Sequence, residues 1–250
     1  MTFKKRLYAL QIKTKFNFEY NLKNVESMAE NCGEGAIILT PEVALSGFCY
    51  QRMNDASEFA KVATERLLEL SHDKTIITTM IEKYNGKFLN NLKVFSRGVM
   101  VHKQTKCKLF PLGDEHNHFS SGKESEICIF DIDSIKCAAL NCFELRFPKL
   151  WELVRGADII FVPGQWGRER KEHWETLTRA LAIANQAFVV CADSANDAMA
   201  KGSAIISPFG VVIKDDKREV ISAEVDLNEV KKMRKYVNVG LIDLYEYPIN

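Results

Sequence analysis

Short apolar runs that suit buried β-strands alternate with amphipathic segments that suit helices, and this alternation restricts the chain to a layered fold. The first expected strand covers residues 6–14. After it, Phe18, Leu22, Val25 and Ala29 recur at helical spacing and predict a helix with one apolar stripe. Because a strand and a helix bury their apolar faces against each other, the pattern favours sheets covered by helices.

The same kinds of segment continue to the end of the chain, with hairpins inserted. Asn85-Gly86 and Arg97-Gly98 stand between β-rich runs and predict hairpin turns. No low-complexity segment, Pro/Gly-rich linker or short repeat interrupts the 250 residues, so we expect residues 1–250 to form one domain of α/β (α+β) class. Further strands are expected over residues 36–42, 74–84, 87–96, 99–103, 127–133, 135–140, 158–163, 187–193, 202–208, 210–213 and 218–226, and further helices over residues 59–70, 150–155, 174–184 and 227–236.

Composition excludes several classes of function. The formal net charge is +1, with lysines and glutamates spread along the chain, so we expect neither a nucleic-acid partner nor a membrane partner. No apolar stretch approaches the roughly 20 residues of a membrane span, and the first residues lack a signal-peptide cleavage site. The cysteines are odd in number and never in C-x-x-C spacing, which predicts reduced thiols, a cytoplasmic location and no zinc site.

Cys142 is the one cysteine in a setting that suits a nucleophile. In "CAALNCFELRFPKL" (137–150) an apolar strand ends at Asn141, and a charged turn that leads into a helix follows. Such a turn places its first residue at the carboxyl edge of a sheet, where free backbone N–H groups favour a thiolate or an oxyanion. We therefore expect Cys142 to be alkylated before the other six cysteines, whereas Cys137 lacks these features and is expected to pack in the core.

Three segments in the right order resemble the carbon–nitrogen hydrolase (nitrilase) superfamily, which uses a Glu–Lys–Cys triad. "ILTPEVALSGF" supplies Glu42, "KCKLFPLGDEHNHFSSG" supplies Lys106, and "NCFELRFPKL" supplies Cys142. Similarity continues through "GADIIFVPGQW", "HWETL", "GSAIISPFG" and "EVDLNEVKKMR", so the resemblance covers nearly the whole chain. It implies a four-layer α-β-β-α sandwich, a homodimer or larger homo-oligomer, a small-molecule amide substrate and no cofactor or metal.

The resemblance also implies a role for each residue of the triad. Glu42 is expected to act as general base, and Cys142 is expected to form a thioester with the acyl group of an amide. Lys106 and the backbone N–H of Phe143 are expected to stabilise the oxyanion, and Glu115 is expected to orient the site. None of the five histidines carries a local Cys–His protease signature.

Two neighbouring lysines are alternatives to Lys106. If residues 106–110 are extended, Lys108 shares a face with Lys106, and Lys103 lies on a different segment. Spacing to the Leu-Phe of the family motif selects Lys106, and Lys108 is expected to be solvated or ion-paired. His116 and His118 lack further spaced ligands, so a loop is favoured there over a metal site.

Among relatives, the chain looks most like the ω-amidase branch, which hydrolyses 2-oxo acid monoamides. Such a substrate carries a free carboxylate, so a cation is expected near the pocket, and Arg168 is our candidate from the group Arg168, Arg170 and Lys171. Trp166 is expected to wall the pocket, and Trp174 to lie in the core. The alternatives are an N-carbamoyl amine hydrolase with the same triad and a catalytically silent binding relative.

The chain departs from the family pattern in one helix. Leu181 and Ala184 occupy positions where relatives usually have Arg and Glu. Losing both charges is far less costly than losing one, so we expect the fold to be kept. The change bears on the pocket or interface beside this helix. Phe143 replaces the usual Tyr and keeps its backbone N–H.

Overall fold

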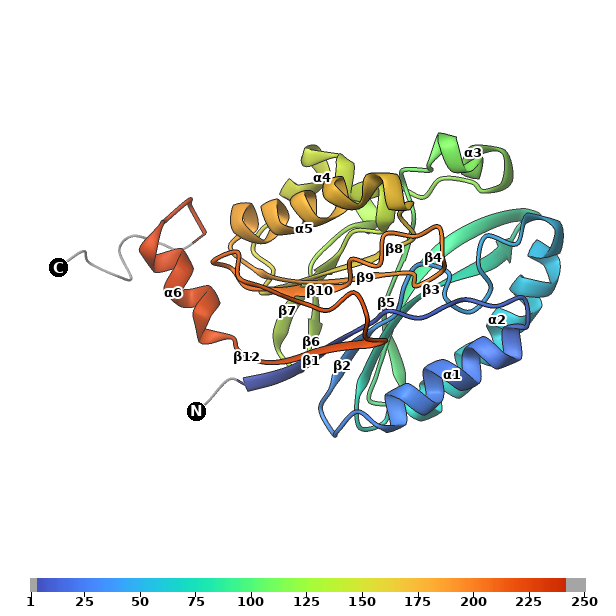
Figure 1. Cartoon of the computed structure of the whole chain (residues 1–250), viewed down its shortest axis with the longest axis horizontal. Helices are drawn as coiled ribbons and strands as arrows, with labels where there is room; N and C mark the ends of the chain where they lie inside the picture. Colours follow the sequence, from blue (N-terminus) through green and yellow to red (C-terminus); the bar gives the residue numbers. More distant parts are fainter. Residues whose placement is uncertain (1–3, 242–250) are drawn as a thin grey trace.

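Two six-stranded mixed sheets form the centre of the molecule, as the computed structural model of residues 4–241 shows (Figure 1). The first sheet has the strand order β12-β1-β2-β3-β4-β5, and the second has the order β11-β10-β9-β8-β7-β6. The strands of the first sheet are β1 (Lys4–Leu10), β2 (Ile37–Leu39), β3 (Thr75–Tyr84), β4 (Lys87–Ser96), β5 (Val99–Thr105) and β12 (Val220–Asp226). Those of the second are β6 (Phe130–Ile132), β7 (Ile135–Ala139), β8 (Ile159–Gly164), β9 (Phe188–Asp193), β10 (Ala204–Ile206) and β11 (Val212–Lys214).

Helices cover the outer face of each sheet. In Figure 1, α1 (Phe18–Glu30) and α2 (Met53–Leu70) lie against the first sheet, and α4 (Pro148–Leu153) and α5 (Lys171–Asn185) lie against the second. The remaining helices are the single turn α3 (Glu115–His118) and α6 (Asn228–Tyr236). The expected α/β class and four-layer α-β-β-α sandwich are therefore confirmed.

The main core lies between the two sheets. Strands of the first sheet contribute residues such as Leu7, Leu39 and Val94, and strands of the second contribute residues such as Phe161 and Val190. All five are completely buried. Because side chains alternate along a strand, the opposite face of each strand is left to pack against the helices. This alternation explains the layers.

The expected strands and helices form, with bounds that differ at their ends, and residues 115–118 form the single helical turn α3 where a loop was expected. The Asn85-Gly86 and Arg97-Gly98 hairpins form with all four residues at positive φ. The helical spacing of Phe59, Val62, Ala63, Leu67 and Leu70 predicts one apolar stripe in α2, but Val62 is 46% exposed and lies outside the buried stripe. The buried stripe consists of Ala56, Ala60, Ala63 and Leu67, whose small side chains allow the helix to approach the sheet closely.

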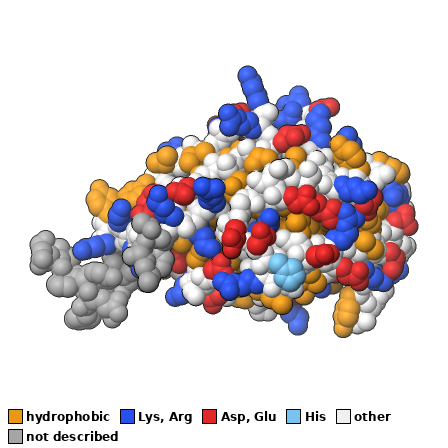
Figure 2. Space-filling model, turned by 90° about the horizontal axis from the view of Figure 1, so that it is seen from below, with side chains coloured by type: hydrophobic (Ala, Val, Ile, Leu, Met, Phe, Trp, Pro, Cys, Tyr) orange, Lys and Arg blue, Asp and Glu red, His pale blue; other side chains and the backbone are white. Residues whose placement is uncertain are grey.

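The surface carries mixed charge. On the face turned downward in Figure 1, lysine and arginine side chains alternate with aspartate and glutamate side chains (Figure 2). This mixture agrees with the formal net charge of +1. Within residues 4–241, no helix is both long enough and apolar enough to cross a membrane.

Candidate active site

The three residues of the expected triad follow strands that end at the same edge of the molecule. Glu42 lies just beyond β2, Lys106 directly follows β5, and Cys142 lies just beyond β7. β2 and β3 are parallel, and β5 is parallel to β3 because each is antiparallel to β4. The carboxyl ends of β2 and β5 therefore coincide, which is where α/β folds gather functional groups.

Lys106 joins two carboxylates. Its Nζ lies 2.7 Å from Oε1 of Glu42 and 2.8 Å from Oε1 of Glu115. The Lys106 and Glu42 side chains have no solvent exposure, and that of Glu115 is 3% exposed. Buried charges persist only when they are paired and hydrogen-bonded, and here one ammonium is shared by two carboxylates.

Electrostatics within this cluster follow from burial and neighbouring charge. Burial disfavours the Lys106 ammonium, but the negative charges of Glu42 and Glu115 and the hydrogen bond to Glu115 outweigh it and raise the pKa of Lys106. Burial raises the pKa of Glu115 to about 7, and the Glu42 charge acts in the same direction against the attraction of Lys106. Lys106 therefore stays a cation, while Glu115 takes up or releases a proton near neutral pH.

One carboxylate oxygen of Glu42 is left free. Asn90 on β4 donates a 2.9 Å hydrogen bond to Oε1, the same oxygen that Lys106 contacts. Oε2 is buried and has no hydrogen-bond partner within the described chain. A buried acceptor without a partner costs free energy and marks an oxygen that is available to take a proton.

Cys142 is the first residue of a short 3₁₀ helix, Cys142–Arg146, and has a left-handed backbone with φ of 53°. This conformation is costly for a residue other than glycine and persists where the surroundings enforce it. Cys142 is 6% exposed, and the backbone N–H of Gln165, just past β8, is directed at its sulfur.

Burial is the largest influence on the thiol, and with the Glu42 charge it raises the pKa of Cys142 well above its usual range. Lys106 opposes this rise. The expectation that the turn would lower this pKa is therefore wrong for the resting protein, because burial raises it and the charges of Glu42 and Glu115 add to the rise. A neutral thiol of this kind needs a base when it attacks.

Cys142 opens into a pocket with about 230 Å³ of empty space. The wall includes Trp166, as expected, and two guanidinium groups, those of Arg146 and Arg170. The Arg146 guanidinium lies 4.5 Å from the centre of the Trp166 ring and contacts His173 at 3.0 Å. Phe110, Phe143 and Gln165 complete the lining.

Neither Arg146 nor Arg170 forms an ion pair with any residue between 4 and 241. Burial and the like charge of Arg170 lower the pKa of the Arg146 guanidinium. Arg168, the candidate from the sequence, is exposed, donates to the carbonyl oxygen of Asp197 and does not line this pocket. The structure thus brings Arg170 to the pocket in place of Arg168.

Phe143 lies beside Cys142 in the 3₁₀ helix and lines the pocket. Its backbone N–H donates no hydrogen bond within the described residues. A free N–H next to a nucleophile is the arrangement that an oxyanion hole needs.

Two buried carboxylates near the pocket escaped the sequence analysis. Glu144 accepts hydrogen bonds from the backbone N–H of Cys107 at 2.6 Å and of Asn141 at 2.7 Å. It stands inside the turn that carries Cys142, so its place in "NCFELRF" was the available signal. Its contact with Cys107 joins segments 35 residues or more apart and could not be read from spacing.

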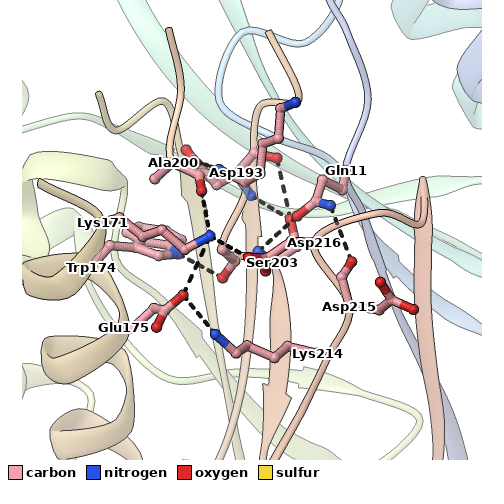
Figure 3. Close-up of polar contacts among 12 residues, drawn as sticks. Gln11, Lys171, Trp174, Glu175, Asp193, Ala200, Ser203, Lys214, Asp215 and Asp216 are labelled. Atoms are coloured by element: carbon pink, nitrogen blue, oxygen red, sulfur yellow. Dashed lines mark hydrogen bonds and ion pairs between the residues drawn. The ribbon is translucent and has the colours of Figure 1, made fainter. Parts of the chain in front are cut away.

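The second is Asp193, at the end of β9. Its carboxylate accepts from the backbone N–H of Trp166 at 2.8 Å and of Lys201 at 3.0 Å. Figure 3 shows Asp193 linked through Ser203 to Gln11, which follows β1. The carboxylate therefore fixes the backbone of the pocket wall at Trp166, and the main chain of Asp193 is linked through Ser203 to the first sheet.

The remaining expected positions are as follows. Lys103 and Lys108 are paired with Glu82 and Glu124 respectively, outside the cluster. Cys137, Trp174 and Leu181 are completely buried, whereas Ala184 is exposed. His118 stacks on Tyr50, and between residues 4 and 241 no group of three or more His, Cys, Asp or Glu side chains is placed to hold a metal ion.

Comparison with known proteins identifies one family and relatives with amidase activity. The family model described as carbon–nitrogen hydrolase matches residues 6–235. The chain is 30% identical to the 2-oxoglutaramate amidase of Bacillus subtilis over 234 residues, covering 88% of this chain and 89% of the relative. It is 29% identical to the omega-amidase NIT2 of Xenopus tropicalis, covering 71% of each.

Solved structures agree on the fold. A carbon–nitrogen hydrolase from Helicobacter pylori superposes with a TM-score of 0.85 at 17% identity, covering 99% of this chain and 97% of that one.

Proposed function

The chain belongs to the carbon–nitrogen hydrolase family, and we propose that it is an amidase that hydrolyses the monoamide of a small 2-oxo dicarboxylic acid to the acid and ammonia. The two relatives named above support this substrate class through their printed activities.

One observation carries the substrate class. Arg146 and Arg170 line the pocket of Cys142 and have no carboxylate partner in the described chain. Two guanidinium groups close together repel each other, and a carboxylate between them would relieve this cost with charge-assisted hydrogen bonds. A substrate whose far end is a carboxylate and whose near end is an amide satisfies both the guanidinium groups and the thiol.

The proposed chemistry assigns a step to each polar group. Oε2 of Glu42, the oxygen without a partner, takes the proton of Cys142 as the sulfur attacks the amide carbonyl. Lys106 and the Phe143 N–H stabilise the tetrahedral oxyanion. Glu42 then returns the proton to the leaving ammonia, and a thioester remains on Cys142. Glu42 next takes a proton from water while the water oxygen attacks the thioester carbonyl. The C–S bond then breaks, the acid leaves, and Glu42 returns the proton to the sulfur of Cys142.

A panel of amides tests the proposal. Ammonia release is measured for 2-oxoglutaramate, for a neutral amide of the same length without the carboxylate, and for an N-carbamoyl amino acid. We expect kcat/KM for 2-oxoglutaramate to exceed that for the neutral amide by roughly 10- to 100-fold, the value of a charge-assisted hydrogen bond.

Cys142→Ala serves as the control and should release no ammonia. Equal rates on the charged and neutral amides would reject the carboxylate requirement. Preference for the carbamoyl compound would instead identify the chain as an N-carbamoyl hydrolase, and no activity on any amide would point to a silent relative.

A further inference from the structure

We infer that Glu144 is a positioning residue that holds Lys106 and Cys142 at a fixed separation by clamping the backbone beside each of them. The inference rests on the proposed function, because it assigns a purpose to a distance within the Glu42–Lys106–Cys142 site. It concerns a side chain that touches neither the pocket nor the reacting groups.

The clamp consists of two short hydrogen bonds to different parts of the chain. One carboxylate oxygen of Glu144 accepts from the N–H of Cys107, the residue after Lys106, at 2.6 Å. The other accepts from the N–H of Asn141, the residue before Cys142, at 2.7 Å. One rigid carboxylate therefore ties the end of β5 in the first sheet to the end of β7 in the second.

The bond from Asn141 also makes Glu144 part of a capping box for the 3₁₀ helix that carries Cys142, whereas the bond from Cys107 reaches outside that helix. Glu144 is completely buried, and it forms no ion pair with any residue of the described chain. Burying a lone carboxylate is expensive, and burial raises the pKa of Glu144 even though two N–H donors oppose the rise. A carboxylate offers two acceptor oxygens and no donor, so each of the two N–H groups has an oxygen of its own.

Asn90 links the same three parts of the site through hydrogen bonds of its own. Its side-chain amide contacts Oε1 of Glu42 at 2.9 Å and the amide of Asn141 at 3.3 Å, and its carbonyl accepts from the N–H of Lys106 at 2.9 Å. The neighbours of all three reacting residues are thus bonded into one network. A displacement of about 1 Å in such a site costs roughly 10²-fold in rate.

Glu144→Gln tests the inference with the smallest change in shape. The amide presents an NH₂ group to one of the two backbone N–H donors, so one hydrogen bond is lost and a repulsive contact replaces it. We expect kcat for ammonia release per folded molecule to fall roughly 10²-fold, with KM changed by less than about threefold. The single-turnover acylation rate should fall by the same factor.

Asp193→Asn is the matched comparison. It changes an equally buried carboxylate that also accepts two backbone N–H bonds, but these bonds fix the pocket wall at Trp166. We expect this variant to raise KM with kcat retained. The same drop in kcat for both variants would show general loosening and overturn the assignment, as would a Glu144→Gln protein that acylates within threefold of wild type.

Two further measurements keep the outcomes separable. If Glu144→Gln does not fold, Glu144→Asp retains the charge and must show a kcat clearly below that of wild type; an unchanged kcat rejects the clamp. Wild type and Cys142→Ala are assayed first. An active wild type with an inactive Cys142→Ala leaves the proposed function standing, so a normal Glu144 variant would then reject only the clamp.

Discussion

Nζ of Lys106 lies 2.7 Å from Oε1 of Glu42, and both side chains are completely buried. With Glu115 as the second partner, one cation and two carboxylates share a space closed to solvent. The cluster can therefore gain a proton more readily than it can lose its cation, which agrees with a pKa of about 7 for Glu115. In the proposed mechanism, this is the cluster that receives the proton of Cys142.

Lys106→Met should remove most of the activity. The variant leaves Glu42 and Glu115 buried without a cation, and the oxyanion loses a charged donor, whose loss costs roughly 10²- to 10³-fold in kcat. The measurement is ammonia release from 2-oxoglutaramate, with far-UV circular dichroism to verify folding. Lys108→Met, which removes a partly exposed lysine paired with Glu124, should keep kcat within about twofold of wild type. Similar losses in both variants would contradict the choice of Lys106.

Arg170→Met should raise KM for an amide that carries a carboxylate by roughly 10- to 100-fold, because one charge-assisted contact is lost. The KM for a neutral amide should stay the same. Arg168→Met is the control, since this exposed side chain lies two residues away and contacts Asp197 instead of the pocket. An effect confined to Arg168→Met would restore the assignment made from the sequence.

Cys128, and not Cys142, should react first with iodoacetamide in the absence of substrate. Cys128 is exposed, whereas Cys142 is buried and its pKa is raised by burial and by Glu42. Because the thiolate is the reactive species, the resting Cys142 should be alkylated slowly. Peptide mapping by mass spectrometry over time gives the order, and first labelling at Cys142 would show that its sulfur is already ionised.

Asp193→Asn should change how stability depends on pH. Burial raises the pKa of Asp193 from 3.8 to about 7, so between these values the folded state binds a proton that the unfolded state has released. Stability from this group is therefore present at low pH and is lost as pH rises toward 7, with a slope of up to about 1.4 kcal/mol per pH unit. Asparagine cannot titrate.

Urea unfolding of wild type and variant at pH 5, 6, 7 and 8 measures this difference. The free energy of unfolding of wild type relative to Asp193→Asn should fall between pH 5 and 7 and level off above that. Parallel curves would mean that Asp193 remains ionised throughout.

The fold and the central triplet were accessible from the sequence because each leaves a local pattern. Strand alternation, helical stripes and two Gly-containing turns predicted the layers. The end of a strand drew attention to Cys142, and the resemblance to the family motifs then selected Glu42 and Lys106. The stripe of α2 was misplaced at Val62, since alanines at residues 56, 60 and 63 give a weak apolar signal and still pack closely.

The parts that escaped depend on contacts across the chain. The sequence does not show that Glu144 reaches Cys107 or that Asp193 reaches Trp166. Nor does it show which of three neighbouring basic residues faces inward, because a short 3₁₀ helix, Arg168–Arg170, sets their directions. The charge around Cys142 was also misjudged, since a turn suggests N–H donors but says nothing about two carboxylates from distant segments.

The site is divided between the two sheets, with Glu42 and Lys106 from one and Cys142 from the other. A folding intermediate in which only one sheet has formed would lack either the base or the sulfur. Recovery of turnover after dilution from denaturant should therefore lag behind the return of secondary structure. The length of the lag would report when the two sheets pack together.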